Sequence, residues 1–118
     1  MKTVLLPHDH GGKLHLAHMP QTADFGTVAE LFKLLGDASR ARLFWILCHC
    51  EECVINLSAM MGMSSPAVSH HLKLLRANGL IVSRREGKEV YYKAADTALV
   101  QQLHEMMEQA LEIACPVH

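Results

Sequence analysis

The stretch NLSAMMGMSSPAVSHHLKLLRANGL, which covers residues 56–80, decides the fold of this chain. Its apolar residues and glycines predict two short helices joined by a tight turn. The first helix is expected to end at Gly62, because glycine readily adopts the backbone conformation that stops a helix. Its expected N-cap is Asn56 or Ser58, since both side chains can accept a hydrogen bond from the first free N–H groups.

The second of these helices has clearer start and stop signals. Ser64 or Ser65 is expected to cap it, with Pro66 in the first turn, where a missing N–H costs nothing. Asn78 and Gly79 are expected to end it. Its predicted buried stripe consists of Val68, Leu72 and Leu75. Two such helices in succession form a helix-turn-helix.

The outward face of this second helix is small and polar. Small residues allow close approach to a groove of double-stranded DNA, and hydroxyl, imidazole and amine groups bond bases or phosphates. The predicted DNA-contacting residues on this helix are Ser64, Ser65, Ala67, Ser69, His70 and Lys73.

The next stretch, LIVSRREGKEVYYK, predicts a β-hairpin with strands at residues 80–84 and 90–93. Arg84, Arg85 and Lys88 crowd its tip, where like charges repel unless an anion is present. A basic hairpin directly after a helix-turn-helix is typical of the wing of a winged helix, which contacts neighbouring phosphates. We therefore add these three residues to the predicted DNA-binding set.

The distribution of charge agrees with a nucleic-acid partner, although the net charge is only −1. Residues 64–93 carry six basic side chains against two acidic ones, so the remainder of the chain is acidic. One basic lobe on an acidic body suits phosphate binding.

Amphipathic helices are predicted on both sides of this segment. One begins near Ala23 and ends at Gly36, and the other runs from an Asp96 cap to about Ala114. Their apolar stripes predict that both helices bury against a second copy of the chain. The expected fold class is thus mainly α with a small β-hairpin, a winged helix-turn-helix that is dimeric through its first and last helices.

Three of the four cysteines fall in FWILCHCEEC, residues 44–53. A helix capped by Asp37 is expected to end near Cys48–Cys50, which places the cluster on a helix end and the turn after it, not in a strand. Such spacing suits metal binding, redox chemistry or, for Cys48, packing alone.

Length and the amino-terminal sequence complete the outline. A chain of 118 residues suits one folded domain, expected at 23–118, preceded at 1–22 by a mobile arm that contains His15 and His18. The arm does not read as a signal peptide, and no apolar run is long enough to span a membrane. A cytoplasmic protein without a membrane partner is expected.

The stretches LFKLLGDASRARLFWIL (31–47) and SSPAVSHHLKLLRANGLIVSRREGKEVYYK (64–93) resemble the ArsR/SmtB family of winged-helix repressors. The likeness covers roughly residues 28–114. It implies a homodimer that binds operator DNA and releases it when a metal ion or a thiol-reactive inducer binds.

The resemblance also implies where an inducer binds, and it leaves two sites open. One is a metal site for zinc, cadmium or a similar transition-metal ion, with the candidate ligands Cys48, Cys50, Cys53, His15 and His18. The other is a thiol pair, Cys48 and Cys115, that senses reactive sulfur or oxidants. A family metal site on the last helix is expected to be missing, since Ala98 stands where it needs histidine.

An enzyme is not expected. His49-Cys50-Glu51 with Cys53 faintly resembles a zinc deaminase, but that chemistry needs the two half-motifs on separate segments. A thioredoxin-like pair needs a βαβ unit, which the chain lacks.

Overall fold

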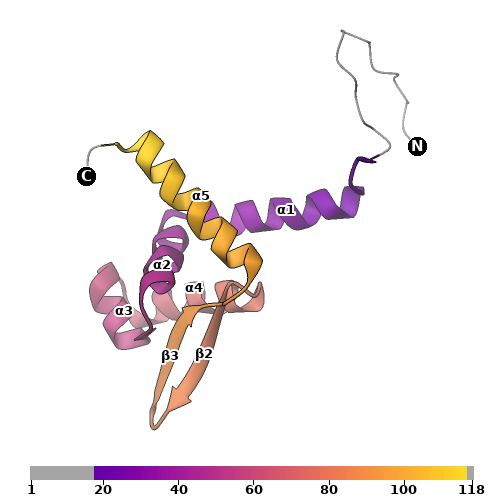
Figure 1. Cartoon of the computed structure of the whole chain (residues 1–118). Coiled ribbons are helices and arrows are strands. Elements are labelled where there is room, and N and C mark those ends of the chain that lie inside the picture. Colours follow the sequence, from indigo (N-terminus) through magenta and orange to yellow (C-terminus); the bar gives the residue numbers. More distant parts are fainter. Residues whose placement is uncertain (1–17, 117–118) are drawn as a thin grey trace.

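The computed structural model describes residues 18–116, which form five helices and three strands (Figure 1). In chain order these are α1 (Thr22–Leu35), α2 (Ala38–His49), β1 (Glu52–Cys53), α3 (Val54–Met61), α4 (Ser65–Ala77), β2 (Ile81–Glu86), β3 (Glu89–Ala94) and α5 (Ala98–Ala114). The fold is the expected winged helix-turn-helix. Residues 1–17, most of the predicted arm, lie outside the described part, as does its candidate ligand His15.

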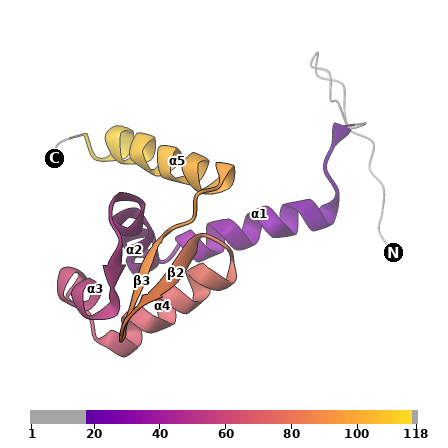
Figure 2. The same ribbon diagram turned by 60° about the horizontal axis from the view of Figure 1, so that its bottom comes forward.

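Helices α3 and α4 form the helix-turn-helix (Figure 2). Gly62 ends α3 in the left-handed conformation, at φ 65°, which only glycine adopts without strain. The hydroxyl of Ser64 caps α4 by accepting from the backbone N–H of Ala67 at 3.3 Å, as predicted. The expected caps of α3 were wrong, because this helix already begins at Val54 and has Cys53 as its N-cap.

The three strands form one antiparallel sheet in the order β1-β3-β2. Strands β2 and β3 make the predicted wing, which turns at Gly87 with a φ of 64°. Cys53 pairs with Tyr91 in β3. The cysteine cluster was expected to avoid strands, and for Cys53 that was wrong: a two-residue strand is too short to show an alternating pattern.

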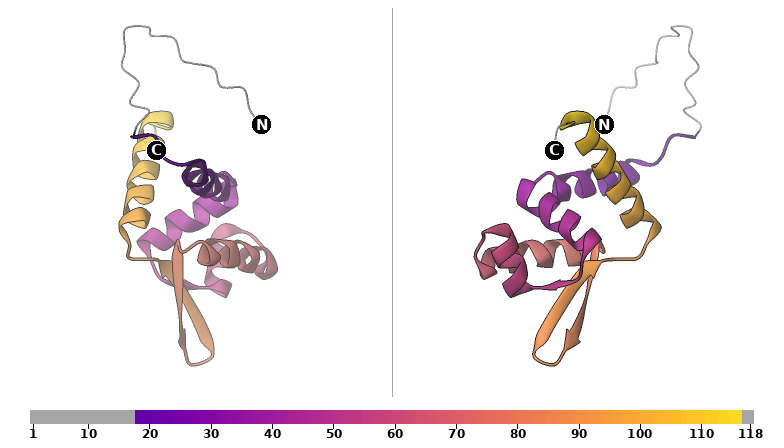
Figure 3. Two further views of the ribbon diagram at one scale, coloured as in Figure 1. Left: turned by 90° about the vertical axis from the view of Figure 1, so that its right-hand side faces the viewer. Right: turned by 60° about the vertical axis from the view of Figure 1, so that its left-hand side comes forward.

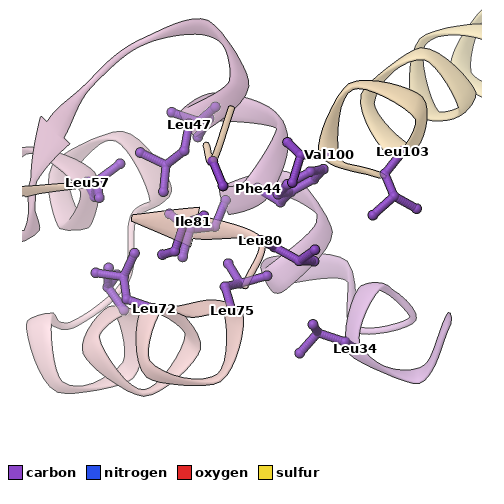
Figure 4. Close-up of a cluster of buried hydrophobic side chains, with 14 of the residues drawn as sticks. Leu34, Phe44, Leu47, Leu57, Leu72, Leu75, Leu80, Ile81, Val100 and Leu103 are labelled. Carbon is purple, nitrogen blue, oxygen red and sulfur yellow. The ribbon is translucent and has the colours of Figure 1, made fainter. Parts of the chain in front are cut away.

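The hydrophobic core lies between α2, α3, α4 and the base of the wing (Figure 4). Its nine fully buried large side chains are Leu43, Phe44, Leu47, Leu57, Val68, Leu72, Leu75, Leu80 and Ile81. Helices α2 and α4 each supply three of them, so the packing between these two helices positions α4 next to the base of the wing.

Helices α1 and α5 lie on the opposite side of the molecule from the wing tip (Figures 1 and 3). Both expose large apolar residues in the single chain, among them Phe25 and Phe32 on α1 and Met106 and Ile113 on α5. The N-cap of α5 is Thr97, whose hydroxyl accepts from Val100 N–H at 3.2 Å, and not Asp96 as expected. Within residues 18–116, none of the helices has the length and apolar character to cross a membrane.

Candidate nucleic-acid interface and candidate metal centre

The start of α4 presents the predicted recognition residues, but two of its hydroxyls already have structural partners. Ser64 caps the helix, and the Ser65 hydroxyl lies 3.1 Å from that of Ser58 on α3. Ser69, His70 and Lys73 are exposed farther along the helix, while Ala67 is half-buried. The side chains at 69, 70 and 73 are therefore the ones available to bases and phosphates.

Arg84 on the wing is neutralised within the chain. Its guanidinium donates to both oxygens of Glu51 at 2.9 Å and to Glu86 at 2.7 Å, and it stands 5.0 Å from the centre of the Tyr91 ring. The hydrogen bonds that Arg84 donates to Glu51, followed by the one it donates to Glu86, raise the pKa of Arg84, while the pairing with Arg84 lowers the pKa of Glu51. Glu51, just before β1, and Glu86 thus supply the anions for Arg84 alone.

The other two wing cations have no such compensation. Among the described residues, Arg85 and Lys88 form no ion pair, and both are exposed. Beside the wing, Lys73 and Arg76 of α4 line a shallow hollow together with Tyr92 of β3. Arg76 was not among the predicted contacts, although its position three residues after Lys73 places it on the same helix face.

The predicted cysteine ligands occupy three different environments. Cys53 is buried, Cys48 is half-buried on α2, and Cys50 is exposed and donates from Sγ to Ile46 O at 3.4 Å. Burial, followed by the charge of Glu108, raises the pKa of the Cys48 thiol to about 11. Desolvation, followed by the charge of Glu52, also raises the pKa of Cys50.

All four cysteines, including the exposed Cys115, are free thiols. Over residues 18–116, the three clustered cysteines are not gathered into a group of three potential ligands. His18 is exposed at the start of the described segment.

One group of potential metal ligands is found in the described segment, and it consists of His49, His104 and Glu108. The Nε2 atoms of the two histidines are 3.0 Å apart. Glu108 Oε1 lies 3.2 Å from the His49 nitrogen and 3.0 Å from the His104 nitrogen. The residues come from the last turn of α2 and from one face of α5.

Trp45 supports this group from the preceding turn of α2. Its Nε1–H donates to Glu108 Oε1 at 2.8 Å, and its ring lies 4.1 Å from that of His49 between centroids. Desolvation raises the pKa of Glu108, but the hydrogen bonds from His49, Trp45 and His104 outweigh it and lower the pKa overall.

His104 and Glu108 are four residues apart on α5 and so share one helical face, but nothing in the sequence brings His49 to them. The i, i+4 spacing on α5 was visible in the sequence. The partner on α2 lies 55 residues earlier in the chain and depends on how the two helices cross.

Comparison with known proteins gives the family. Residues 37–83 match the model of the arsR family of bacterial regulatory proteins. The chain is 41% identical to a transcriptional repressor SmtB homologue of Synechocystis over 72% of its own length and 64%, just under two thirds, of that protein. It is 37% identical to the arsenic resistance regulator ArsR2 of Pseudomonas putida, over 73% of this chain and 75% of that protein.

Solved structures agree with the sequence matches. HlyU of Vibrio cholerae superposes with a TM-score of 0.69 at 26% identity, over 75% of this chain and 96% of that one. A homodimeric winged helix-turn-helix DNA-binding domain of Mycobacterium bovis, described as a possible ArsR-family regulator, gives a TM-score of 0.69 at 27% identity. That match covers 92% of this chain and 96% of the other. The helix order, the wing and these matches together show that the chain belongs to the ArsR/SmtB family of winged-helix transcriptional regulators.

Proposed function

We propose that this protein is a transcriptional repressor that binds double-stranded operator DNA as a homodimer and releases it when a metal ion binds. The observation that carries the proposal is the pairing of an exposed polar face on α4 with an adjacent basic wing. Ser69, His70 and Lys73 are available to the groove, and Arg85 and Lys88 are available to the flanking phosphates. The same surface also contains four predicted contact residues that are half-buried or already have partners within the chain: Ser64, Ser65, Ala67 and Arg84.

The proposed dimer interface consists of α1 and α5. Both helices expose large apolar side chains, such as Phe25, Phe32 and Met106, and burying this surface in an interface is favourable. A symmetric partner supplies that cover and places two copies of α4 about one DNA turn, roughly 34 Å, apart. The operator expected from this arrangement is a palindrome.

Metal response is proposed from the family and from the ligands in the chain. The ligand set predicted from the sequence is Cys48, Cys50 and Cys53 with arm histidines 15 and 18, for zinc or cadmium. The raised pKa of Cys48 weakens it as a ligand, since a metal must first displace its proton. The protein is proposed to act in the cytoplasm as a regulator and not as an enzyme.

The second candidate function is thiol-based sensing by Cys48 and Cys115. Similarity to HlyU of Vibrio cholerae, one of whose solved structures is described as reduced, and the free state of both thiols favour it. Against it, a thiol with a pKa of about 11 is almost entirely protonated at neutral pH, and the thiolate is the reactive form. We therefore rank it second.

A fluorescence-anisotropy titration of DNA from the protein's own promoter tests these proposals. The reduced protein is expected to bind, and zinc, cadmium or nickel is expected to release it. Release by a persulfide donor alone, lost in Cys48→Ser and Cys115→Ser, would instead establish the thiol sensor. An absence of binding at low salt would exclude operator recognition.

A further inference from the structure

We propose that His49, His104 and Glu108 bind a divalent ion of the zinc class within one subunit, between the end of α2 and α5. The site contains two imidazoles and one carboxylate and no thiolate. This inference rests on the proposed function, because it names the site at which a metal would regulate DNA binding. It differs from the cysteine set predicted from the sequence and does not need the amino-terminal arm.

The three ligand atoms already form the base of a coordination polyhedron. They are 3.0, 3.0 and 3.2 Å apart, so the triangle is nearly equilateral. A tetrahedral ion with bonds of about 2.0–2.1 Å separates its ligands by roughly 3.3 Å. An ion placed on the exposed side of the triangle therefore binds all three atoms after shifts of a few tenths of an ångström, and its fourth position is open to water.

The hydrogen bonding of the metal-free group is incomplete. Each neutral imidazole carries one N–H, and either its Nδ1 or its Nε2 is the donor. The contact between the two Nε2 atoms at 3.0 Å needs a proton on one of them, and that nitrogen also faces Glu108 Oε1. A cation on the exposed side of the triangle bonds all three ligand atoms at once, which a single shared proton does not do.

The surroundings hold the ligands in place. Trp45 Nε1 donates to the same Glu108 oxygen at 2.8 Å and its indole packs against the His49 ring. Hydrogen bonds of this kind orient metal ligands and tune their affinity. The side chains of His49, His104 and Glu108 are 43%, 27% and 46% exposed, so an ion enters directly from solvent.

The donor set selects the ion. Imidazole and carboxylate suit zinc, cobalt(II) and nickel(II), whereas thiolates favour softer ions such as copper(I). Both thiols nearest in sequence, Cys48 and Cys50, have a raised pKa and so resist the loss of the proton that ligation requires. At the proposed site only the proton shared at Nε2 must leave, and a neutral imidazole can carry its proton on Nδ1 instead.

The position of the site connects it to the DNA-binding surface. His49 is the last residue of α2, and Glu51, two residues later, holds Arg84 of the wing. The next residue, Glu52, begins β1, which pairs with the wing strand β3. An ion that fixes His49 against α5 therefore restrains the segment that leads into the wing.

Cobalt(II) titration of the reduced, DNA-free dimer tests the site directly. We expect one ion per subunit, a visible spectrum typical of tetrahedral coordination, and no near-ultraviolet thiolate-to-cobalt band. His104→Gln and Glu108→Gln are each expected to weaken binding more than about 100-fold, and Trp45→Phe about 10- to 100-fold. The matched control Glu105→Gln, which changes an exposed carboxylate on the same helix, is expected to bind cobalt normally.

A thiolate band that disappears in Cys50→Ser/Cys53→Ser, with normal binding by His104→Gln, would overturn the inference. Circular dichroism of each variant separates ligand loss from unfolding. Because the titration contains no DNA, a failure to bind metal can be told apart from a failure to recognise the operator. Metal binding at this site without any effect on DNA affinity would uphold the centre and refute its proposed regulatory role.

Discussion

The uneven partnering of the three wing cations predicts an uneven contribution to DNA binding. Arg85 and Lys88 form no ion pair within the described chain, whereas Arg84 is held by Glu51 and Glu86. Each phosphate contact contributes about 0.9 to the slope of log affinity against log salt concentration. The double variant Arg85→Ala/Lys88→Ala removes two contacts per subunit, so the slope for a dimer should flatten by about 3.6.

This change is large enough to measure. When the salt concentration rises fourfold, the DNA affinity of the wild type should fall by a factor about 10² larger than the factor for the double variant. Arg84→Ala should flatten the slope by less than about 0.9 per subunit, because its guanidinium must exchange two carboxylates for a phosphate. Fluorescence anisotropy with promoter DNA at four salt concentrations gives the slopes, and Lys33→Ala on α1 is the charge-matched control. Equal effects of Arg84→Ala and of an Arg85→Ala single variant would refute the reasoning.

Three further predictions concern the folded chain itself. Phe44→Ala should lower the free energy of unfolding by about 3–5 kcal/mol, because the ring is fully buried; a loss below about 1 kcal/mol in urea unfolding would contradict the core assignment. The alkylation rate of Cys48, followed by mass spectrometry, should rise about tenfold per pH unit from pH 7 to 10, since its pKa is about 11; a plateau near pH 8.5 would contradict its burial. The pKa of Asp37 lies below its ordinary 3.8 because its carboxylate accepts a hydrogen bond from the Arg40 N–H. The ionised carboxylate therefore stabilises the folded state fully at pH values above the ordinary pKa, and this stabilisation is lost as the pH falls through the lowered pKa. Asp37→Asn should therefore weaken the pH dependence of unfolding in that acidic range, and parallel curves for the two proteins would refute this.

The sequence predicted the fold well where local signals are strong. Gly62 and Ser64 fixed the turn and the start of α4, because a left-handed glycine and a hydroxyl cap each act through neighbouring backbone groups. Local signals failed where two residues compete or where a strand is short. Asp96 and Thr97 both have capping side chains, and only the backbone geometry selects Thr97.

The candidate sites were harder to predict, because they depend on tertiary contacts. Glu51 and Arg84 are 33 residues apart, so the sequence could not show that one wing cation is neutralised. His49 and His104 meet only because α2 and α5 cross near these residues. The cysteine spacing was conspicuous in the sequence, yet it does not gather three thiols in the described segment, because Cys53 turns into the sheet while Cys50 remains exposed.

The most direct test of the account is the affinity of the reduced protein for its promoter DNA with and without zinc. We predict that zinc weakens binding by roughly 5- to 150-fold, the range of a coupling of about 1–3 kcal/mol. The loss should disappear in His104→Gln and persist in Glu105→Gln. An operator affinity that is the same with zinc, cadmium, nickel and no metal would contradict the proposed metal-responsive repressor.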